Sequence, residues 1–255
     1  MIHELRERLD TYFYWIHERE TIRLNKEVEQ KPPPWTDDSI LQKFKFCQVF
    51  REDDRTTRWF RTHIRDPYRD DPEVLMATVI FRWFNYIETG RTLVKNKLHL
   101  EWDRKKAIEE ITKQNKWVTG AYIVKTPNRM DKVTGVAECI SHMWGDREKL
   151  VEKILATNSL EESWNILRDY EDILTWANAG PGAMRGLNRL AGRELGFCKR
   201  SHPWNEEMRN LWEISREKLN PNLIDLDKFE MREIEGGLCE FDKYSRIVKG
   251  QGRTR

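Results

Sequence analysis

Helical periodicity runs through almost the whole chain and limits its possible folds more than any other feature of the sequence. In the first 30 residues, one helical stripe at spacings of three and four consists of Tyr12, Trp15, Ile16, Arg19, Ile22 and Arg23. Consecutive prolines then end this helix, because they exclude helical backbone. We expect further helices from about residue 36, over 51–64 and 71–87, and near 101–115, 134–144, 146–156, 160–178, 183–192, 205–219 and 227–246.

Strand signals are confined to one stretch of the sequence. Residues 118–124, VTGAYIV, fit a short strand or an irregular link, and we find no partner strand for them. The sequence therefore predicts an all-α fold with a single helical domain over residues 1–255. The basic residues at 247–255 are expected to form a tail that is mobile or ordered by a polyanion.

The charge balance limits how the chain binds polyanions. Forty-five Lys and Arg residues oppose 43 Asp and Glu residues, so the net charge is only +2. A diffuse polybasic coat is excluded, and any polyanion site must be a local patch. The most apolar run, residues 73–88, is too short to span a bilayer and contains Arg82, and the first residues lack an apolar signal stretch. We expect no membrane association.

Cysteine and glycine spacing exclude several classes of site. Cys47, Cys139, Cys198 and Cys239 form neither a CxxC pair nor a zinc-like spacing, which fits a reducing cytosol and predicts no metal site. The sequence contains neither a P-loop nor a GxGxxG motif.

Polar residues on apolar helix faces are the first candidates for a site. Arg82 and Asn85 lie three apart in the apolar run, so they either pair with a core carboxylate or line a polar pocket suited to a phosphate. Arg19 and Arg23 lie four apart on the N-terminal stripe, and their alternative is to snorkel into water.

A charged ridge follows in VFREDDRTTRW. Arg51, Arg55 and Arg58 fall at i, i+4 and i+7 of an expected helix, beside Asp53 and Asp54. On a surface these groups would form ordinary ion pairs. At the edge of a core, a carboxylate between arginines would be held ionised and oriented.

A glycine-rich turn, ANAGPGAMRGLNRL, precedes another expected helix. Gly180 and Gly182 permit backbone N–H groups to approach a phosphate at the helix N-terminus, as in the hairpin of helix-hairpin-helix DNA-binding modules. The alternative is an ordinary helix–helix turn.

Two carboxylates flank the apolar stripe of the last helix. Glu235 and Asp242 are seven apart and so lie on one side of that helix. Partial burial would raise the pKa of such a carboxylate and make it a base near neutral pH. The alternative is a solvated edge with Lys243 as a counter-charge.

Five of these segments together resemble a known family. WTDDSILQKFKF, VFREDDR, FRWFN, GPGAMRGLNRL and LCEFDKY are similar to the α-glutamyl/putrescinyl thymine pyrophosphorylases, or amino acid:DNA transferases, of bacteriophages. The resemblance extends from Tyr12 to Arg253 and includes the helical module of 5-hydroxymethyluracil DNA kinases. A helical fold like that of DNA glycosylases is a weaker implication.

The resemblance implies one step of thymine hypermodification in phage DNA. A kinase makes 5-(pyrophosphoryloxymethyl)uracil in the polymer, and the transferase replaces the pyrophosphate with the amine of an amino acid or polyamine. The implied partners are DNA with modified thymine, the amine co-substrate and a 5-hydroxymethyluracil DNA kinase, in the bacterial host cytoplasm. No cofactor is implied, while a Mg²⁺ ion on the pyrophosphate stays open, as do the amine donor and the choice between direct displacement and elimination–addition.

The implied reaction assigns roles to the candidate residues. Cations stabilise the leaving group, a carboxylate takes the proton of the amine, and an aromatic ring stacks on the flipped base. The pyrophosphate-binding candidates are Arg19, Arg23, Lys43, Arg51, Arg55, Arg82 and Asn85. The base is Asp242 first and Asp54 second, with Glu235 and Asp53 also placed in the catalytic group. DNA-binding candidates are Gly180, Gly182, Arg185 and Lys243, and the stacking candidates are Trp35 and Trp59.

Two other functions remain open from the sequence. A helix-hairpin-helix glycosylase acting on a modified pyrimidine would share the turn, the aspartate and base flipping. A non-catalytic module that recruits a DNA base kinase would bind DNA with exposed cations alone.

Overall fold

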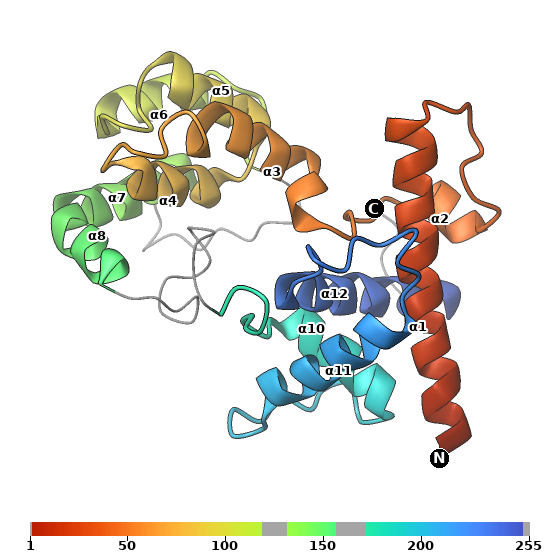
Figure 1. Cartoon of the computed structure of the whole chain (residues 1–255). Helices are drawn as coiled ribbons and strands as arrows, with labels where there is room; N and C mark the ends of the chain where they lie inside the picture. The colour runs from red at the N-terminus through yellow and green to blue at the C-terminus, as the bar shows by residue number, and fades with distance from the viewer. Residues whose placement is uncertain (1, 119–131, 157–171, 252–255) are drawn as a thin grey trace. The chain divides into compact units, whose positions relative to one another are not determined.

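The computed structural model describes residues 2–118, 132–156 and 172–251. All regular elements in these ranges are helices and none is a strand, which confirms the all-α prediction (Figure 1). Of the stretch at 118–124, all but Val118 lies outside the described residues, as do most of the helix expected at 160–178 and the last four residues of the tail.

The contacts divide the chain into two compact units. The first consists of Met1–Asp54 and Ser159–Arg255, and the second of Arg55–Asn158. Among the described residues, the first unit has one hydrophobic cluster of buried side chains and the second unit has two. The single domain predicted over 1–255 stays a prediction.

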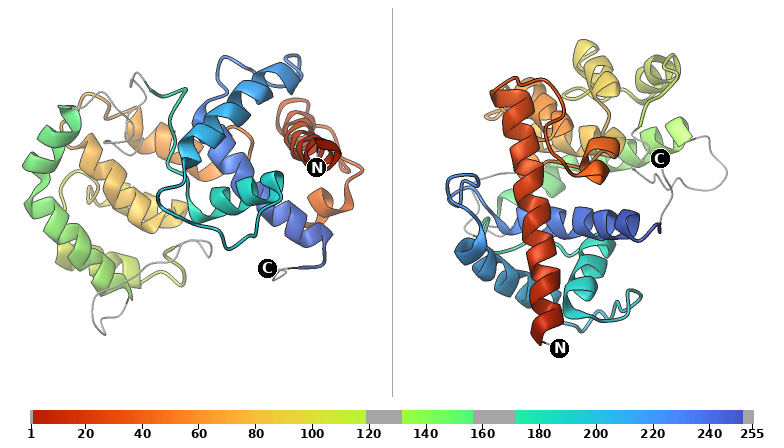
Figure 2. Two further views of the ribbon diagram at one scale, coloured as in Figure 1. Left: turned by 90° about the horizontal axis from the view of Figure 1, so that it is seen from below. Right: turned by 90° about the vertical axis from the view of Figure 1, so that its right-hand side faces the viewer.

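The first unit is built around the last helix, α12 (Met231–Val248). Helix α1 (Ile2–Arg23) crosses α12 steeply in the views of Figures 1 and 2. The other elements of this unit are a short π-helix after α1 (Leu24–Val28), α2 (Ser39–Lys43), a 3-10 helix (Arg51–Asp53), α10 (Pro181–Ala191) and α11 (Trp204–Lys218).

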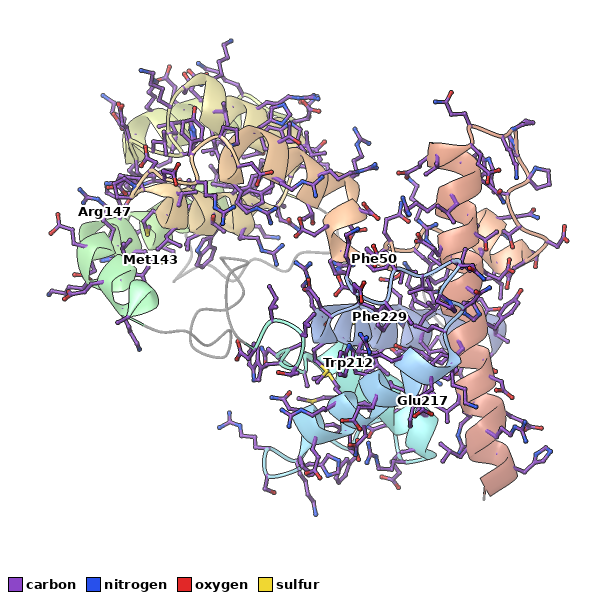
Figure 3. The ribbon with its side chains drawn as sticks, viewed as in Figure 1. Phe50, Met143, Arg147, Trp212, Glu217 and Phe229 are labelled. Carbon is purple, nitrogen blue, oxygen red and sulfur yellow. The ribbon has the colours of Figure 1, made fainter. Side chains whose placement is uncertain are left out.

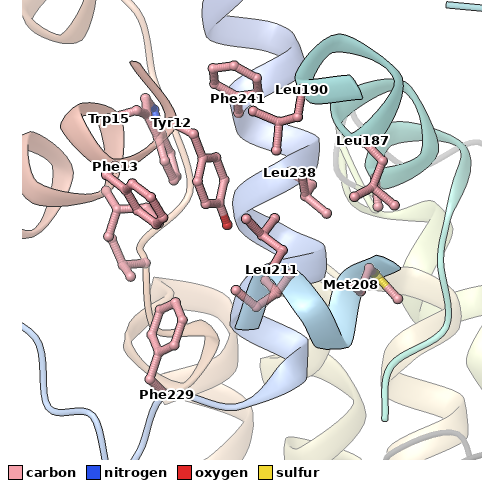
Figure 4. Packing of buried hydrophobic residues seen from close by; sticks show 14 of the residues in the cluster. Tyr12, Phe13, Trp15, Leu187, Leu190, Met208, Leu211, Phe229, Leu238 and Phe241 are labelled. Carbon is pink, nitrogen blue, oxygen red and sulfur yellow. The ribbon is translucent and has the colours of Figure 1, made fainter. Parts of the chain in front are cut away.

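The core of the first unit confirms the apolar stripe expected at the N-terminus. Tyr12, Trp15 and Ile16 are fully buried in one cluster with Leu238 and Phe241 of α12. The Tyr12 ring lies edge-on to that of Phe241, with 5.5 Å between centroids (Figure 4). The segments between helices join the same core. For example, Phe50 packs edge-on against Phe229, and the Trp212 indole N–H donates to the Phe229 carbonyl at 2.6 Å (Figure 3).

Helix α12 begins later than the sequence suggests. The expected start at Asp227 is wrong, because a capping box forms at Glu230: its side chain and that of Glu233 each accept the other residue's backbone N–H. Asp227 instead lies in the preceding turn, where its N–H donates to Asp225.

Two glycines let α10 pack closely against α12. A Cβ atom on Gly182 would lie 1.9 Å from the sulfur of Cys239, and one on Gly186 would lie 2.4 Å from the backbone oxygen of Leu238. Both glycines are inside α10, so their role in this structure is to allow helix–helix contact.

The second unit surrounds the apolar helix α4 (Val74–Phe84), most of which is buried as expected. The remaining elements are α3 (Arg55–Phe60), a short π-helix (Arg61–Arg65), α5 (Ile87–Lys95), α6 (Arg104–Thr112), α7 (Lys132–Gly145) and α8 (Arg147–Leu155). Arg147, labelled at the start of α8 in Figure 3, pairs with Glu73 before α4 at 3.0 Å.

Candidate active site

Arg51 lies at the centre of a polar cluster in the first unit. Its Nη1 pairs with Asp54 Oδ2 at 2.8 Å, and its backbone N–H donates to Glu233 Oε1 at 3.1 Å. A Cβ atom on Gly236 would lie 3.0 Å from Arg51 Cδ, so the arginine stem follows bare backbone of α12. One third of the Arg51 side chain is exposed, which leaves the cation accessible from solvent.

Two carboxyl groups beside Arg51 have raised pKa values. Burial raises the pKa of Glu235, although Arg51 and the hydrogen bond from the Gly180 N–H oppose the shift. Burial likewise raises the pKa of Asp54 against the opposing effects of Arg51 and of the Gln48 N–H, which donates to Asp54 Oδ1 at 2.9 Å. We call Arg51, Asp54 and Glu235 the Arg51 cluster.

The charge on Arg51 is retained in this cluster. Burial disfavours the guanidinium, but the attraction of the Asp54 carboxylate opposes burial and the pKa of Arg51 is raised. The nearby thiols are poor nucleophiles: burial raises the pKa of Cys47, and burial followed by Glu235 raises that of Cys239 to about 12. The cluster therefore combines a fixed cation with carboxyls that titrate closer to neutral pH than usual.

The two arginines predicted on α1 have structural partners. Arg19 Nε donates to the Cys47 carbonyl at 3.0 Å, and burial lowers its pKa, with Asp54 as the largest opposing charge. Arg23 binds the buried Glu20 through Nε at 3.0 Å and pairs with Asp53 at 3.4 Å. Arg19 therefore borders the Arg51 cluster, while Arg23 and Asp53 form a separate ion pair.

Asp242 has the opposite environment from the one predicted for a base. Its side chain is 1% exposed and accepts hydrogen bonds from Arg189 Nε at 2.7 Å, Arg185 Nε at 3.0 Å and Arg246 Nε at 3.2 Å. Burial alone would raise its pKa, but Arg189 and Arg185 outweigh burial and lower it. The predicted rise in the Asp242 pKa is wrong, since the sequence pattern did not include these arginines.

The glycine turn also differs from its predicted geometry. Gly180 is the N-cap of α10 and Pro181 its first residue, as expected for a helix N-terminus. However, the Gly180 N–H already donates to Glu235, and Gly182 packs against Cys239. DNA binding by Gly180 and Gly182 stays a prediction, and helix packing explains why position 182 lacks a side chain.

Three further candidates of the first unit lie outside the Arg51 cluster. Lys43 is exposed and lines a cavity of about 430 Å³ with Ile247 and Gly250. Trp35 is half-buried, donates to the Lys31 carbonyl and has the Lys26 ammonium 4.9 Å from its ring centroid. Lys243 donates to the Lys45 carbonyl, pairs with Glu240 at 3.3 Å and lies 4.5 Å from the Phe46 ring centroid.

The second unit contains the other four predicted site residues. The expected ridge of Arg51, Arg55 and Arg58 is wrong, because the chain is extended at Asp54 and a new helix begins at Arg55. The expected placement of Arg82 and Asn85 on one buried helix face is also wrong: Arg82 is exposed, and Asn85 ends α4 in a left-handed conformation with φ 46°.

Trp59 is part of the core of the second unit. Its ring stacks on His63 at 4.7 Å and on Phe81 at 5.4 Å between centroids, and its side chain is buried. Neighbouring rings cover Trp59, so this structure leaves no room for a base to stack on it.

Several residues that complete these sites carry no signal that was recognised in the sequence. Arg189 and Arg246 hold Asp242, and Glu240 accepts from the Cys47 N–H at 3.2 Å. The signal was the i, i+4 spacing of Arg185 with Arg189 and of Asp242 with Arg246. This spacing places each pair of side chains on one face of its helix. Within the described ranges, no group of three or more His, Cys, Asp or Glu side chains suits a metal ion, and no helix is long and apolar enough to cross a membrane.

Comparison with known proteins shows one family. A model of the family described as "5-hmdU DNA kinase, helical domain" matches residues 6–175 and 172–253. A protein of Bacillus phage SP10 named "5-hmdU DNA kinase" is 25% identical over 92% of this chain. The match covers 44% of that relative, so the chain spans less than half of its length. No solved structure matches.

Proposed function

The chain belongs to the family of the 5-hmdU DNA kinase helical domain, and from that premise we propose that it is an amino acid or polyamine:DNA transferase. It replaces the pyrophosphate of 5-(pyrophosphoryloxymethyl)uracil in DNA with an amine and releases pyrophosphate. Residues 1–255 contain no P-loop motif, so we assign to them the transfer step and not the ATP-dependent step that makes this base.

The single observation that supports this proposal best is the Arg51 cluster. Pyrophosphate leaves with the electron pair of the broken C–O bond, so charge develops on its oxygens and a fixed cation lowers the barrier. Arg51 is such a cation, and Asp54 at 2.8 Å orients it. Arg19, bound to the backbone of the same segment, is the second cation in reach of this position.

The amine needs a proton acceptor, and the pKa values favour Glu235 over Asp242 for that role. An α-ammonium is protonated near neutral pH, and only the free amine attacks carbon. The nitrogen forms the new C–N bond at the methylene, and the proton that it loses passes to a carboxylate. Glu235 has a raised pKa, whereas Asp242 is held ionised by arginines and is a weak base.

Product mass tests the proposed reaction. The protein is incubated with pyrophosphorylated DNA and a mixture of glycine, glutamate and putrescine, and the DNA is digested to nucleosides for mass spectrometry. We expect release of pyrophosphate and a nucleoside heavier than thymidine by the mass of one amine less two hydrogens, because the C–N bond replaces one C–H bond of the methyl group and one N–H bond of the amine.

Arg51→Ala should lower the rate about 10²–10³-fold, the usual effect of removing one transition-state donor. The matched control is Arg216→Ala, because Arg216 is an exposed arginine of α11 that binds the Leu226 carbonyl in the same unit. Abasic sites would instead identify a glycosylase. DNA binding with unchanged nucleosides would identify a non-catalytic module.

A further inference from the structure

A second charged cluster lies on α10 and α12, away from the reacting groups proposed above. Asp242 on α12 accepts from Arg185 and Arg189 on α10 and from Arg246 one turn further along α12. We call these four residues the Asp242 cluster. Three guanidinium groups around one carboxylate leave an excess of positive charge at this place.

The arrangement is buried at its centre and open at its edge. The Asp242 side chain is 1% exposed and that of Arg189 is 8% exposed, whereas Arg185 and Arg246 are 43% and 39% exposed. Each arginine contacts Asp242 through Nε, so the carboxylate fixes the guanidinium planes from the inner side. The outer edges of Arg185 and Arg246 are thus oriented in advance, which lowers the entropy lost on binding an anion.

One buried donor in this cluster also lacks an acceptor. Arg189 Nη2 is buried and makes no hydrogen bond within the described part of the chain. A buried donor without a partner is costly, so an oxygen-rich anion beside it would be favoured.

We propose that the Asp242 cluster binds a backbone phosphate of DNA, and that Asp242 is a positioning residue for the arginines. A phosphodiester carries one negative charge and two oxygens that suit forked guanidinium donors. The net charge of the chain is only +2, so DNA binding requires a local patch of this kind.

The position on α12 connects the Asp242 cluster with the Arg51 cluster. Asp242 and Glu235 are seven residues apart on one helix, so they lie on the same side about 10 Å apart along its axis. The inference deepens the proposed function and rests on it only for the choice of DNA as the ligand.

Binding of unmodified duplex DNA, without amine, tests the phosphate site separately from the transfer reaction. We expect Arg185→Ala with Arg246→Ala to weaken binding at least about tenfold and to lower the slope of log K against log [salt] by about 1, since each phosphate contact contributes about 0.9. Arg216→Ala is again the matched control and should change neither value. An unchanged slope in the double variant would overturn the proposal, whatever the transferase assay shows.

Asp242→Asn separates positioning from simple charge. The substitution adds one unit of positive charge, which by itself would tighten DNA binding. We expect weaker binding instead, because the arginines lose their anchor; tighter binding would contradict the proposal. If this variant does not fold, Arg185→Lys with Arg246→Lys keeps both charges and should still weaken binding, whereas wild-type affinity would contradict a role for guanidinium geometry.

Titration with inorganic pyrophosphate distinguishes the two phosphate sources. The double alanine variant should bind pyrophosphate as wild type does. A variant that loses pyrophosphate binding and keeps DNA binding would assign these arginines to the leaving group and overturn the proposal.

Discussion

Asp242 and Glu235 show how neighbouring residues decide the chemistry of a carboxylate. Both lie on the same side of α12, and burial pushes both pKa values upward. The difference comes from the arginines: two from α10 lower the pKa of Asp242, while Glu235 has Arg51 nearby and one backbone N–H. The sequence predicts that the two positions share a side of the helix, but the arginine partners are set by helix packing.

Glu235→Gln tests the proposed base. Gln keeps an acceptor for the Gly180 N–H but cannot take a proton, so we expect a rate loss of about 10²–10⁴ at pH 7. Because the pKa of Glu235 is raised, wild-type activity should grow as pH rises through that pKa and the carboxylate forms. In the variant, activity should grow only at higher pH, where the amine deprotonates unaided. Initial rates across pH measure both profiles.

Unfolding of the same variant separates catalysis from structure. A carboxyl whose folded pKa is raised contributes its full stabilisation below its unfolded pKa and has lost this contribution once the pH has risen through the folded pKa. Glu235→Gln stays neutral, so its melting temperature at pH 7 should equal or exceed that of wild type. A slow variant that is also less stable would point to a structural role, and full activity at pH 7 would exclude Glu235 as the base.

At the scale of elements, the contact between α10 and α12 depends on two glycines with different neighbours. Gly182→Ala meets a side-chain sulfur at 1.9 Å, whereas Gly186→Ala meets a backbone oxygen at 2.4 Å. We expect each to lower the free energy of unfolding by about 1–3 kcal/mol, the usual cost of overpacking. Adding Cys239→Ala should restore most of the loss at 182, because it removes the sulfur. No change to the Leu238 side chain should restore Gly186→Ala.

Chemical denaturation measures these differences, with Gly196→Ala as the control. A Cβ atom on Gly196 meets nothing within 4 Å, so this variant should be close to wild type. If Gly182→Ala were as stable as wild type yet bound DNA more weakly, the glycine would act as the sequence predicts, at a phosphate.

Helices could be predicted from the sequence where apolar residues recur at helical spacing. Helix ends could not be predicted where tertiary contacts determine them. The stripe of Tyr12, Trp15 and Ile16 is buried as expected, because the spacing alone defines one face. The break at Asp54 depends on its side chain binding Arg51 and the Gln48 N–H, which no periodicity shows. The end of α4 at Asn85 uses a left-handed conformation that Asn tolerates but does not require. Arg51 was therefore identified as a candidate residue but was wrongly included in the helix that begins at Arg55.

At the scale of the whole molecule, burial is divided between separate cores. Tyr12, Leu238 and Phe241 belong to the core of the first unit, whereas Trp59 and Phe81 belong to a core of the second. A unit with its own core has the main requirement for unfolding as a unit. A single helical domain, as predicted from the sequence, would instead lose both cores in one step.

Calorimetry of paired glycine variants distinguishes these two behaviours. Gly186→Ala disturbs the first unit, and Gly90→Ala the second, where a Cβ atom would lie 2.3 Å from the Trp59 ring and 2.7 Å from Phe81. We expect two transitions, each lowered by one variant only, and a calorimetric enthalpy above the van't Hoff value. One transition that both variants lower, with equal enthalpies, would contradict this expectation and support the single domain.

Repeating the scans with duplex DNA tests which unit binds it. Because the Asp242 cluster lies in the first unit, DNA should raise the melting temperature of the transition that Gly186→Ala lowers.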